Sequence, residues 1–446
     1  MKFRLRDYRD VGRIVSTRRL MQEAPWWDRP RLDDWVAERH RAIAVHAATH
    51  IPFYRRQFAE IGVDPGRCDD PGEWRRLPTI DKATVRAHLE DLRAPNRFCA
   101  GAVWGSTSGS TGMSLRFLLD RRVNAAAFAM LWRAWESGGF WRFGQRQCSL
   151  KGTEGELGWR YNRVIRTLAL STYRLNRDAA RVYRDLILRF RPRFIRGYPS
   201  ALFLFCRFLR ELELPLHVPM VIMGSEMVHD FQRRMVEEVL GARVFNHYTH
   251  WERAASILEC GQGRLHAQPD FGDVEILDGE GQPVAPGVTG EIVATGFYNL
   301  AMPLLRYRTG DLARRSAEPC PCGSSFPVVD HIEGRVSDML RCSDGSLTAT
   351  SALTLRDTGI PISYCQIIQR EPNAVEVRLV PGTGFDRQQH GREVETVLHR
   401  WLGEDTRVDL VLCDLEGLLR SPAGKIRSCV NLLPTEGGGG PATGGG

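Results

Sequence analysis

The first 95 residues carry the hydrophobic spacing of helices. Over residues 32–47 the apolar side chains recur close to every 3.6 positions, which predicts an amphipathic helix. Pro52 breaks that pattern because proline cannot continue a helix, and Asp70-Pro71 marks the start of another. We therefore expect a mostly helical N-terminal part over residues 1–95.

Short apolar runs that predict strands follow this helical part. Residues 99–104 and 115–119 are two such runs, and they flank a segment of glycine, serine and threonine. From residue 120 onwards helix-like stretches alternate with strand-like runs, including residues 194–197, 218–223 and 243–246. This alternation implies a parallel sheet whose ligands bind at the carboxyl ends of the strands.

The pattern changes again after residue 272. Residues 272–315 alternate apolar and polar positions between glycine-rich turns, which predicts an antiparallel β section. Residues 335–433 mix short strands and helices, and the glycine-rich tail 434–446 cannot form a core and is expected to be disordered. The expected fold class is α/β: a large domain over residues 1–334, with parallel sheets flanked by helices plus the antiparallel section, and a small α+β domain over residues 335–433.

Composition agrees with a soluble globular protein of more than one domain. The chain has 446 residues, of which 43% are hydrophobic and 26% charged. No apolar run is long enough to span a membrane, and the N-terminus lacks the apolar core of a signal peptide. We therefore expect a cytoplasmic protein, and no disulfides among its eleven scattered cysteines.

Arginine supplies almost all of the positive charge. The net charge is +8, and the only lysines are Lys2, Lys82, Lys151 and Lys425. No basic run is interleaved with aromatic residues, so we expect no nucleic-acid partner. The scarcity of lysine makes each one a candidate for a specific role.

Residues 105–112 are all glycine, serine or threonine. Glycine lets the backbone approach a ligand closely, and hydroxyl and N–H groups can surround phosphate oxygens. No lysine follows the last glycine, so this is not a P-loop. Taken alone, the segment fits a solvated hairpin turn equally well.

The order of several separated motifs resembles the adenylate-forming (acyl-CoA synthetase-like) superfamily, and more closely its phenylacetate–CoA ligase and CapK-type branch. The motifs span residues 51–55, 77–82, 106–112, 197–200, 224–226, 248–252, 302–311 and 334–338, with Lys425 after Pro422-Ala423-Gly424. The resemblance covers residues from about 40 to 430, and residues 302–311 are its strongest member.

The resemblance implies a ligase that activates an organic acid with ATP. The acid's carboxylate attacks the α-phosphate, giving an acyl-adenylate and pyrophosphate, and catalysis depends on positioning and charge stabilisation. Coenzyme A then accepts the acyl group while the small domain swings about a hinge near Asp338. Two alternatives stay open: an amine or hydroxyl acceptor in a polysaccharide or natural-product pathway, and a decayed nucleotide-binding homologue.

The resemblance also assigns the nucleotide-binding residues. The phosphates fall to Ser106, Thr107, Ser108, Gly109, Ser110, Thr111 and Gly112. The base falls to Gly224, Ser225, Glu226, Asn246, Tyr248 and Thr249, with Tyr248 stacking on adenine. Asp311 would accept hydrogen bonds from the ribose hydroxyls, because an ionised carboxylate accepts only. The alternative for Tyr248 is an aromatic side chain of the hydrophobic core. The alternative for Asp311 is an aspartate in a surface turn.

Three further residues are assigned to catalysis. Glu252 would hold Mg²⁺ at the phosphates, Arg335 would contact ribose or phosphate, and Lys425 would reach the α-phosphate. The alternative for Glu252 is a glutamate at the N-terminus of a helix, and the alternative for Lys425 is an ordinary exposed lysine. Thr249 departs from the branch, which usually has glycine there, and this questions the geometry of the adenine and acyl pocket.

Four metal-binding residues form a separate pattern. Cys260 and His266 are six positions apart, and Cys320 and Cys322 flank a single proline. Three thiols and an imidazole suit tetrahedral zinc, and some members of the branch carry such a site, so we expect a structural Zn²⁺. Thiols placed in turns by chance are the alternative.

The sequence does not identify the acid substrate. Trp132, Trp135 and Phe140 hint at an aromatic or bulky acid, although aromatic residues at helical spacing are more often core. A homodimer is an expectation drawn from the family.

Overall fold

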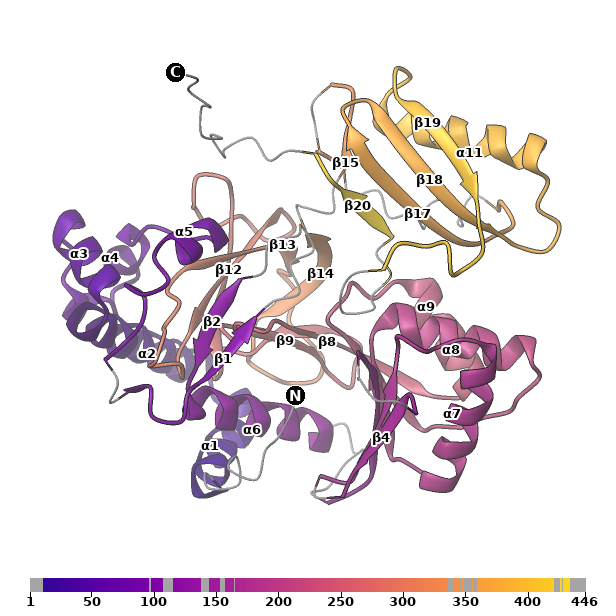
Figure 1. Cartoon of the computed structure of the whole chain (residues 1–446). Helices are drawn as coiled ribbons and strands as arrows, with labels where there is room; N and C mark the ends of the chain where they lie inside the picture. The colour runs from indigo at the N-terminus through magenta and orange to yellow at the C-terminus, as the bar shows by residue number, and fades with distance from the viewer. Residues whose placement is uncertain are drawn as a thin grey trace, which may run out of the picture. The chain divides into compact units, whose positions relative to one another are not determined.

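The computed structural model describes two compact units, with the boundary between Gly334 and Arg335 (Figure 1). The described residues are 11–95, 98–106, 115–137, 144–152, 157–163, 165–335, 340–344, 347–348, 355, 359–420, 426 and 428–433. The predicted positions 107–112, Asp338, Lys425 and the tail 434–446 lie outside them. Within the described residues, no helix combines the length and apolar composition that a membrane crossing requires.

The N-terminal part is helical, as predicted. Its helices are α1 (Val11–Glu23), α2 (Arg29–His50), α3 (Pro52–Ile61), α4 (Pro71–Arg76) and α5 (Lys82–Ala87). Pro52 ends α2 and begins α3, where its missing N–H costs nothing. The side chains of Asp70 and Asp81 accept hydrogen bonds from the first turns of α4 and α5. These caps fix the segment that leads towards the large sheet.

A twelve-stranded sheet organises the first unit. Its order is β11-β12-β13-β14-β10-β9-β8-β7-β6-β3-β5-β4. The strands are β3 (Gln147–Lys151), β4 (Trp159–Asn162), β5 (Thr167–Ser171), β6 (Phe194–Gly197), β7 (Met220–Gly224), β8 (Arg243–Thr249), β9 (Ser256–Glu259), β10 (Leu265–Ala267), β11 (Gly272–Leu277), β12 (Thr289–Gly296), β13 (Tyr307–Arg315) and β14 (Val328–Arg335).

Both predicted β sections are present in this sheet. Strands β5, β3, β6, β7 and β8 are parallel, and β11, β12 and β13 are antiparallel. The connecting helices include α7 (Arg177–Phe190), α8 (Pro199–Glu211) and α9 (Asp230–Leu240). Strand β8 runs to Thr249, three residues further than the pattern predicts, so Tyr248 lies on the strand itself.

Helix α6 (Arg121–Ser137) covers one face of the parallel strands. Its Trp135 packs with Phe194 of β6, Ile222 of β7 and Phe245 of β8. The apolar side chains of α6 explain why it docks there. Before α6, β1 (Val103–Ser106) and β2 (Arg116–Leu119) pair antiparallel, with Ser106 opposite Arg116. The strands predicted on either side of the Gly/Ser/Thr segment are therefore confirmed.

The second unit is a small α+β fold, as predicted. A four-stranded sheet has the order β19-β18-β17-β20, and β15 and β16 form a separate pair. The elements are β15 (Leu340–Arg341), β16 (Leu347–Thr348), β17 (Ile362–Glu371), β18 (Ala374–Pro381), α11 (Arg387–Leu402), β19 (Arg407–Leu412) and β20 (Cys429–Asn431). Val394, Leu398 and Leu402 of α11 pack into its core against Ile367 and Val377.

Candidate active site and metal centre

Two hydrogen bonds join the end of β8 to β13. The Tyr248 hydroxyl donates to Oδ2 of Asp311 at 2.7 Å, and the Tyr307 hydroxyl donates to Oε1 of Glu252 at 3.0 Å. The structure thus brings together three of the residues that the motifs single out, Tyr248, Glu252 and Asp311. Their side chains come from segments about 60 residues apart in sequence.

The curvature of the sheet makes this meeting possible. Strands β9, β10 and β14 lie between β8 and β13 in the sheet order. In a flat sheet four strand spacings would separate β8 from β13 by roughly 19 Å, since neighbouring strands lie about 4.8 Å apart. Direct side-chain hydrogen bonds therefore require the sheet to curl over, and the antiparallel section forms one wall of the site.

Glu252 is buried yet ionised. Burial opposes its charge, but the hydrogen bond from His250 and the charge of Lys82 outweigh that effect and lower the pKa of Glu252 to about 2. The Ala255 amide donates to Nε2 of His250 at 3.2 Å, so Nδ1 carries the proton that points to Glu252, 3.3 Å away. Glu252 thus offers a fixed, negatively charged carboxylate, the ligand type that Mg²⁺ prefers.

Lys82 is a site residue whose role the sequence reasoning missed. Its ammonium donates to the Thr309 carbonyl oxygen at 3.0 Å, beside Asp311, and its charge acts on Glu252. Ile80 holds this segment against β13: its amide donates to the Arg306 oxygen at 3.1 Å, and its oxygen accepts from the Arg308 amide at 2.8 Å. The scarcity of lysine and the motif at residues 77–82 were the available signals.

His250 and Tyr307 were also missed as partners of Glu252. The motif at residues 248–252 contains His250, and the structure shows that it hydrogen-bonds to Glu252. Tyr307 lies in the strongest motif but was given no role. Only the curl of the sheet shows that its hydroxyl reaches Glu252.

The turn after β7 leaves no room for a side chain at Gly224. A Cβ at Gly224 would lie 2.4 Å from the His247 carbonyl oxygen, so only glycine fits beside β8. Ser225 follows with φ of 71°, and Oε2 of Glu226 accepts from the Ser200 amide at 3.0 Å, at the start of α8. The turn therefore presents Ser225 while it caps a neighbouring helix.

Asn246 and Thr249 both lie within β8. The Asn246 amide donates to Oε2 of Glu259 at 2.6 Å. Thr249 pairs with Ser256 of β9 and does not have a positive φ. A β-branched residue suits an extended strand, so the backbone here does not require the glycine that is usual in the branch.

The remaining predicted residues cannot be placed by their side chains. Arg335 ends β14, and only its backbone is described. Thr107, Ser108, Gly109, Ser110, Thr111, Gly112 and Lys425 lie outside the described residues, so their roles stay predictions.

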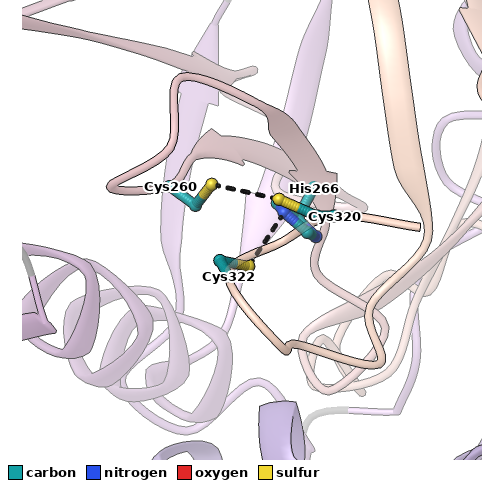
Figure 2. A group of neighbouring side chains, drawn as sticks. All are labelled: Cys260, His266, Cys320 and Cys322. Atoms are coloured by element: carbon teal, nitrogen blue, oxygen red, sulfur yellow. Dashed lines mark hydrogen bonds between the residues drawn. The ribbon is translucent and has the colours of Figure 1, made fainter. Parts of the chain in front are cut away.

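The four predicted metal ligands meet at one point (Figure 2). Cys260 is in the turn after β9, His266 is in β10, and Cys320 and Cys322 are in the loop between β13 and β14. Their ligand atoms all lie within 4.8 Å of one another, with 3.7 Å between the sulfurs of Cys260 and Cys320. Thiolates on a tetrahedral zinc lie roughly 3.7 Å apart when Zn–S bonds are about 2.3 Å, so the residues fit this ion.

The imidazole of His266 has the tautomer that a metal ligand needs. Its Nδ1 donates to the Phe326 carbonyl oxygen at 3.0 Å, which leaves Nε2 with a lone pair, 3.6 Å from the Cys322 sulfur. Burial opposes ionisation of Cys260, but the neighbouring imidazole of His266 and hydrogen bonds from the backbone lower the pKa of its thiol to about 6. A soft, partly anionic donor set of this kind suits zinc.

Comparisons with known proteins support the motif-based resemblance. The chain is 23% identical over 372 residues to Protein CapK of Staphylococcus aureus, covering 80% of each chain. It is 29% identical over 377 residues to a phenylacetate–coenzyme A ligase of Thermus thermophilus, covering 79% of this chain and 81% of the relative. No family model matches the sequence.

Solved structures with the same fold include a 2-hydroxyisobutyryl-CoA ligase in complex with 2-HIB-AMP. The TM-score is 0.74 at 18% identity, covering 92% of this chain and 91% of the other. The same ligase with 2-HIB-AMP and CoA gives a TM-score of 0.61. At this identity the likeness shows the fold alone.

Proposed function

We propose that this chain, a homologue of the phenylacetate–CoA ligases and of CapK, is an AMP-forming carboxylate ligase. It uses ATP to convert an organic acid into an acyl-adenylate, and coenzyme A accepts the acyl group. The observation that carries the proposal is the hydrogen bond from Tyr248 to Asp311, next to the pair of Tyr307 and Glu252. The named relatives and the shared fold support it.

Each residue of the site has a task in this reaction. Asp311 accepts hydrogen bonds from the ribose hydroxyls through oxygens that Tyr248 orients. The ring of Tyr248 stacks on adenine, beside Gly224, Ser225, Glu226, Asn246 and Thr249. Ser106 and residues 107–112 surround the phosphates.

Two groups of the described site help to compensate the negative charge of the phosphates. Glu252, held by His250 and Tyr307, would hold Mg²⁺, which neutralises phosphate charge as pyrophosphate leaves. Lys82 adds positive charge beside Asp311. Arg335 and Lys425 complete the set, with Lys425 at the α-phosphate. A carboxylate that is ionised at neutral pH needs no base to attack phosphorus.

The zinc site is structural in this proposal. Three thiols and one imidazole leave no open position for a substrate, which distinguishes structural from catalytic zinc. Zinc would fasten the β9–β10 turn to the loop between β13 and β14.

A second acceptor class stays open, because the motifs also resemble the CapK-type branch. The relative CapK covers as much of this chain as the phenylacetate–CoA ligase does. An amine or a hydroxyl group is therefore the alternative to coenzyme A as the acyl acceptor. The first half-reaction is the same in both cases.

ATP–pyrophosphate exchange with a panel of aryl and alkyl carboxylic acids tests the proposal. Exchange that depends on one acid class supports adenylation, and added coenzyme A or amines would then identify the acceptor. Folded protein that binds no ATP and exchanges with no acid would favour a decayed homologue instead.

A further inference from the structure

Arg196 lies near the carboxyl end of β6, on the face of the sheet that α6 covers. It pairs in register with Ser149 of β3 and Ile222 of β7. Paired residues of parallel strands share a face, so Arg196 projects on the same side as Ile222, which packs with Trp135 of α6. Its guanidinium lies 5.8 Å from the centroid of the Trp135 ring.

The guanidinium of Arg196 has no acidic partner among the described residues. Its Nε is shielded from solvent and makes no hydrogen bond there. Burial lowers the pKa of Arg196 to about 10, and the only opposing influence comes from the Cys148 thiol. A cation–π contact offsets part of the lost hydration but supplies no hydrogen-bond acceptor in the plane of the guanidinium.

Two buried arginines of this unit are neutralised by carboxylates, whereas Arg196 is half-buried. Arg133 pairs with Asp270, and Arg306 pairs with Glu275 at 3.2 Å. Arg196 instead has a shielded Nε without an acceptor and no carboxylate among the described residues, so it can receive an anion from outside the chain. The place also fits a ligand, because small molecules bind at the carboxyl ends of parallel strands.

The anion that Arg196 would meet is distinct from the nucleotide. Side chains alternate along a strand, and the register puts Phe245 and His247 on the face of Arg196 but Tyr248 on the other. On the Arg196 face, Lys151 at the end of β3 lies 5.5 Å from the ring centroid of Tyr198. This end of the sheet face therefore carries two basic side chains and aromatic rings.

We propose that Arg196 binds a second anionic group, distal to the reacting carboxylate, on the acid substrate. The inference rests on the proposed function and specifies its substrate class: acids that carry a second carboxylate or a comparable anion. The reacting carboxylate would lie towards Glu252 and the nucleotide, and the distal anion would lie between β6 and Trp135.

Matched pairs of acids test this inference. ATP–pyrophosphate exchange would be measured with glutarate, adipate and terephthalate, and with the monomethyl ester of each, which keeps the shape but removes the distal charge. In the wild type at least one dicarboxylate should exceed its ester about 10- to 100-fold in kcat/KM, the range of a charge-assisted hydrogen bond. Arg196→Met should remove this preference, Arg196→Lys should retain part of it, and the KM for ATP should not change.

The outcomes separate the inference from the proposed function. Exchange that is equal or better with the esters, and insensitive to Arg196→Met, would overturn the inference while leaving adenylation intact. No exchange with any acid, in protein that also fails to bind ATP, would count against the proposed function. If Arg196→Met does not fold, the dicarboxylate-to-ester ratio of the wild type and of Arg196→Lys decides the question.

Discussion

At the scale of single residues, the site depends on hydroxyl groups that reach across the curled sheet. Tyr248 and Tyr307 each donate to a carboxylate that sequence motifs assign to the nucleotide or its metal. Each hydroxyl fixes one carboxylate oxygen and leaves the carboxylate able to accept from a ligand as well. Orientation of this kind allows binding without further ordering of the side chain.

We predict that Asp311→Asn and Tyr248→Phe both weaken ATP binding. Asparagine replaces one acceptor oxygen by an NH₂ donor and removes the negative charge, so the KM for ATP should rise roughly 10- to 100-fold. Tyr248→Phe keeps the ring but frees Asp311, so its KM should rise by about tenfold or less. Tyr161→Phe, on the exposed edge strand β4, is the control in pyrophosphate exchange. An unchanged KM for ATP in Asp311→Asn would remove Asp311 from the nucleotide site.

A second residue-scale prediction concerns the close approach at Gly224. A methyl group there would lie 2.4 Å from backbone oxygen, which cannot rotate away, so β7 and β8 must shift. Gly224→Ala should lower the free energy of unfolding by about 1–3 kcal/mol, as overpacking does. Gly279→Ala is the control, because nothing lies within 4 Å of its added Cβ. Urea denaturation that gives equal stability for both variants would contradict this reading of the turn.

At the scale of elements, the β9–β10 turn and the loop between β13 and β14 depend on each other. Cys260 and His266 come from one, and Cys320 and Cys322 come from the other. The same loop contacts the N-terminal part, where the Ser325 amide donates to the Pro25 oxygen at 2.9 Å, and Phe326 packs with Trp27 and Leu32. A metal that holds this loop in place therefore also stabilises the packing of α2.

We predict that the purified protein holds about one zinc ion per chain and that Cys320→Ser loses it. The variant should melt several degrees lower than the wild type, because metal binding contributes to the stability of the folded state. Elemental analysis and thermal unfolding measure the two effects. Cys99→Ser, a half-buried cysteine outside the cluster, should change neither. Zinc-free wild type that is as stable as the metal-treated protein would argue against a structural ion.

At the scale of the whole molecule, the chain combines two compact units of different architecture. The first contains the twelve-stranded sheet and the candidate site, and the second contains a four-stranded sheet covered by α11. The resemblance implies that the small domain swings between adenylation and acyl transfer. That motion stays a prediction, and Lys425 is the residue through which it can be tested.

We predict that Lys425→Ala separates the two half-reactions. Loss of one charge that stabilises the transition state should reduce ATP–pyrophosphate exchange by about 10²- to 10³-fold. Transfer from chemically prepared acyl-adenylate to coenzyme A should be nearly unaffected, because the α-phosphate is no longer attacked. Lys2→Ala is the matched control for the loss of a lysine. Equal loss in both half-reactions would assign Lys425 a structural role.

Local patterns predicted most of the elements. The break at Pro52, the helix start at Asp70-Pro71, the parallel strands and the small α+β unit follow from backbone restrictions and hydrophobic spacing. The zinc ligands were also predicted, because four residues of the right chemistry are rare enough in one chain to indicate a site. Their meeting within 4.8 Å is consistent with that prediction.

The sequence by itself determined the motifs and the chemistry that their residue types offer, since these depend on residue type and on short-range spacing. Only the tertiary structure decided which of them meet: Tyr248 with Asp311, Tyr307 with Glu252, and Lys82 beside both. The physical reason is the curl of the sheet, a sum of small twists over many strands that no local pattern records. The isolation of Arg196 from any described carboxylate is likewise a property of packing, because its partners are set by register and by α6.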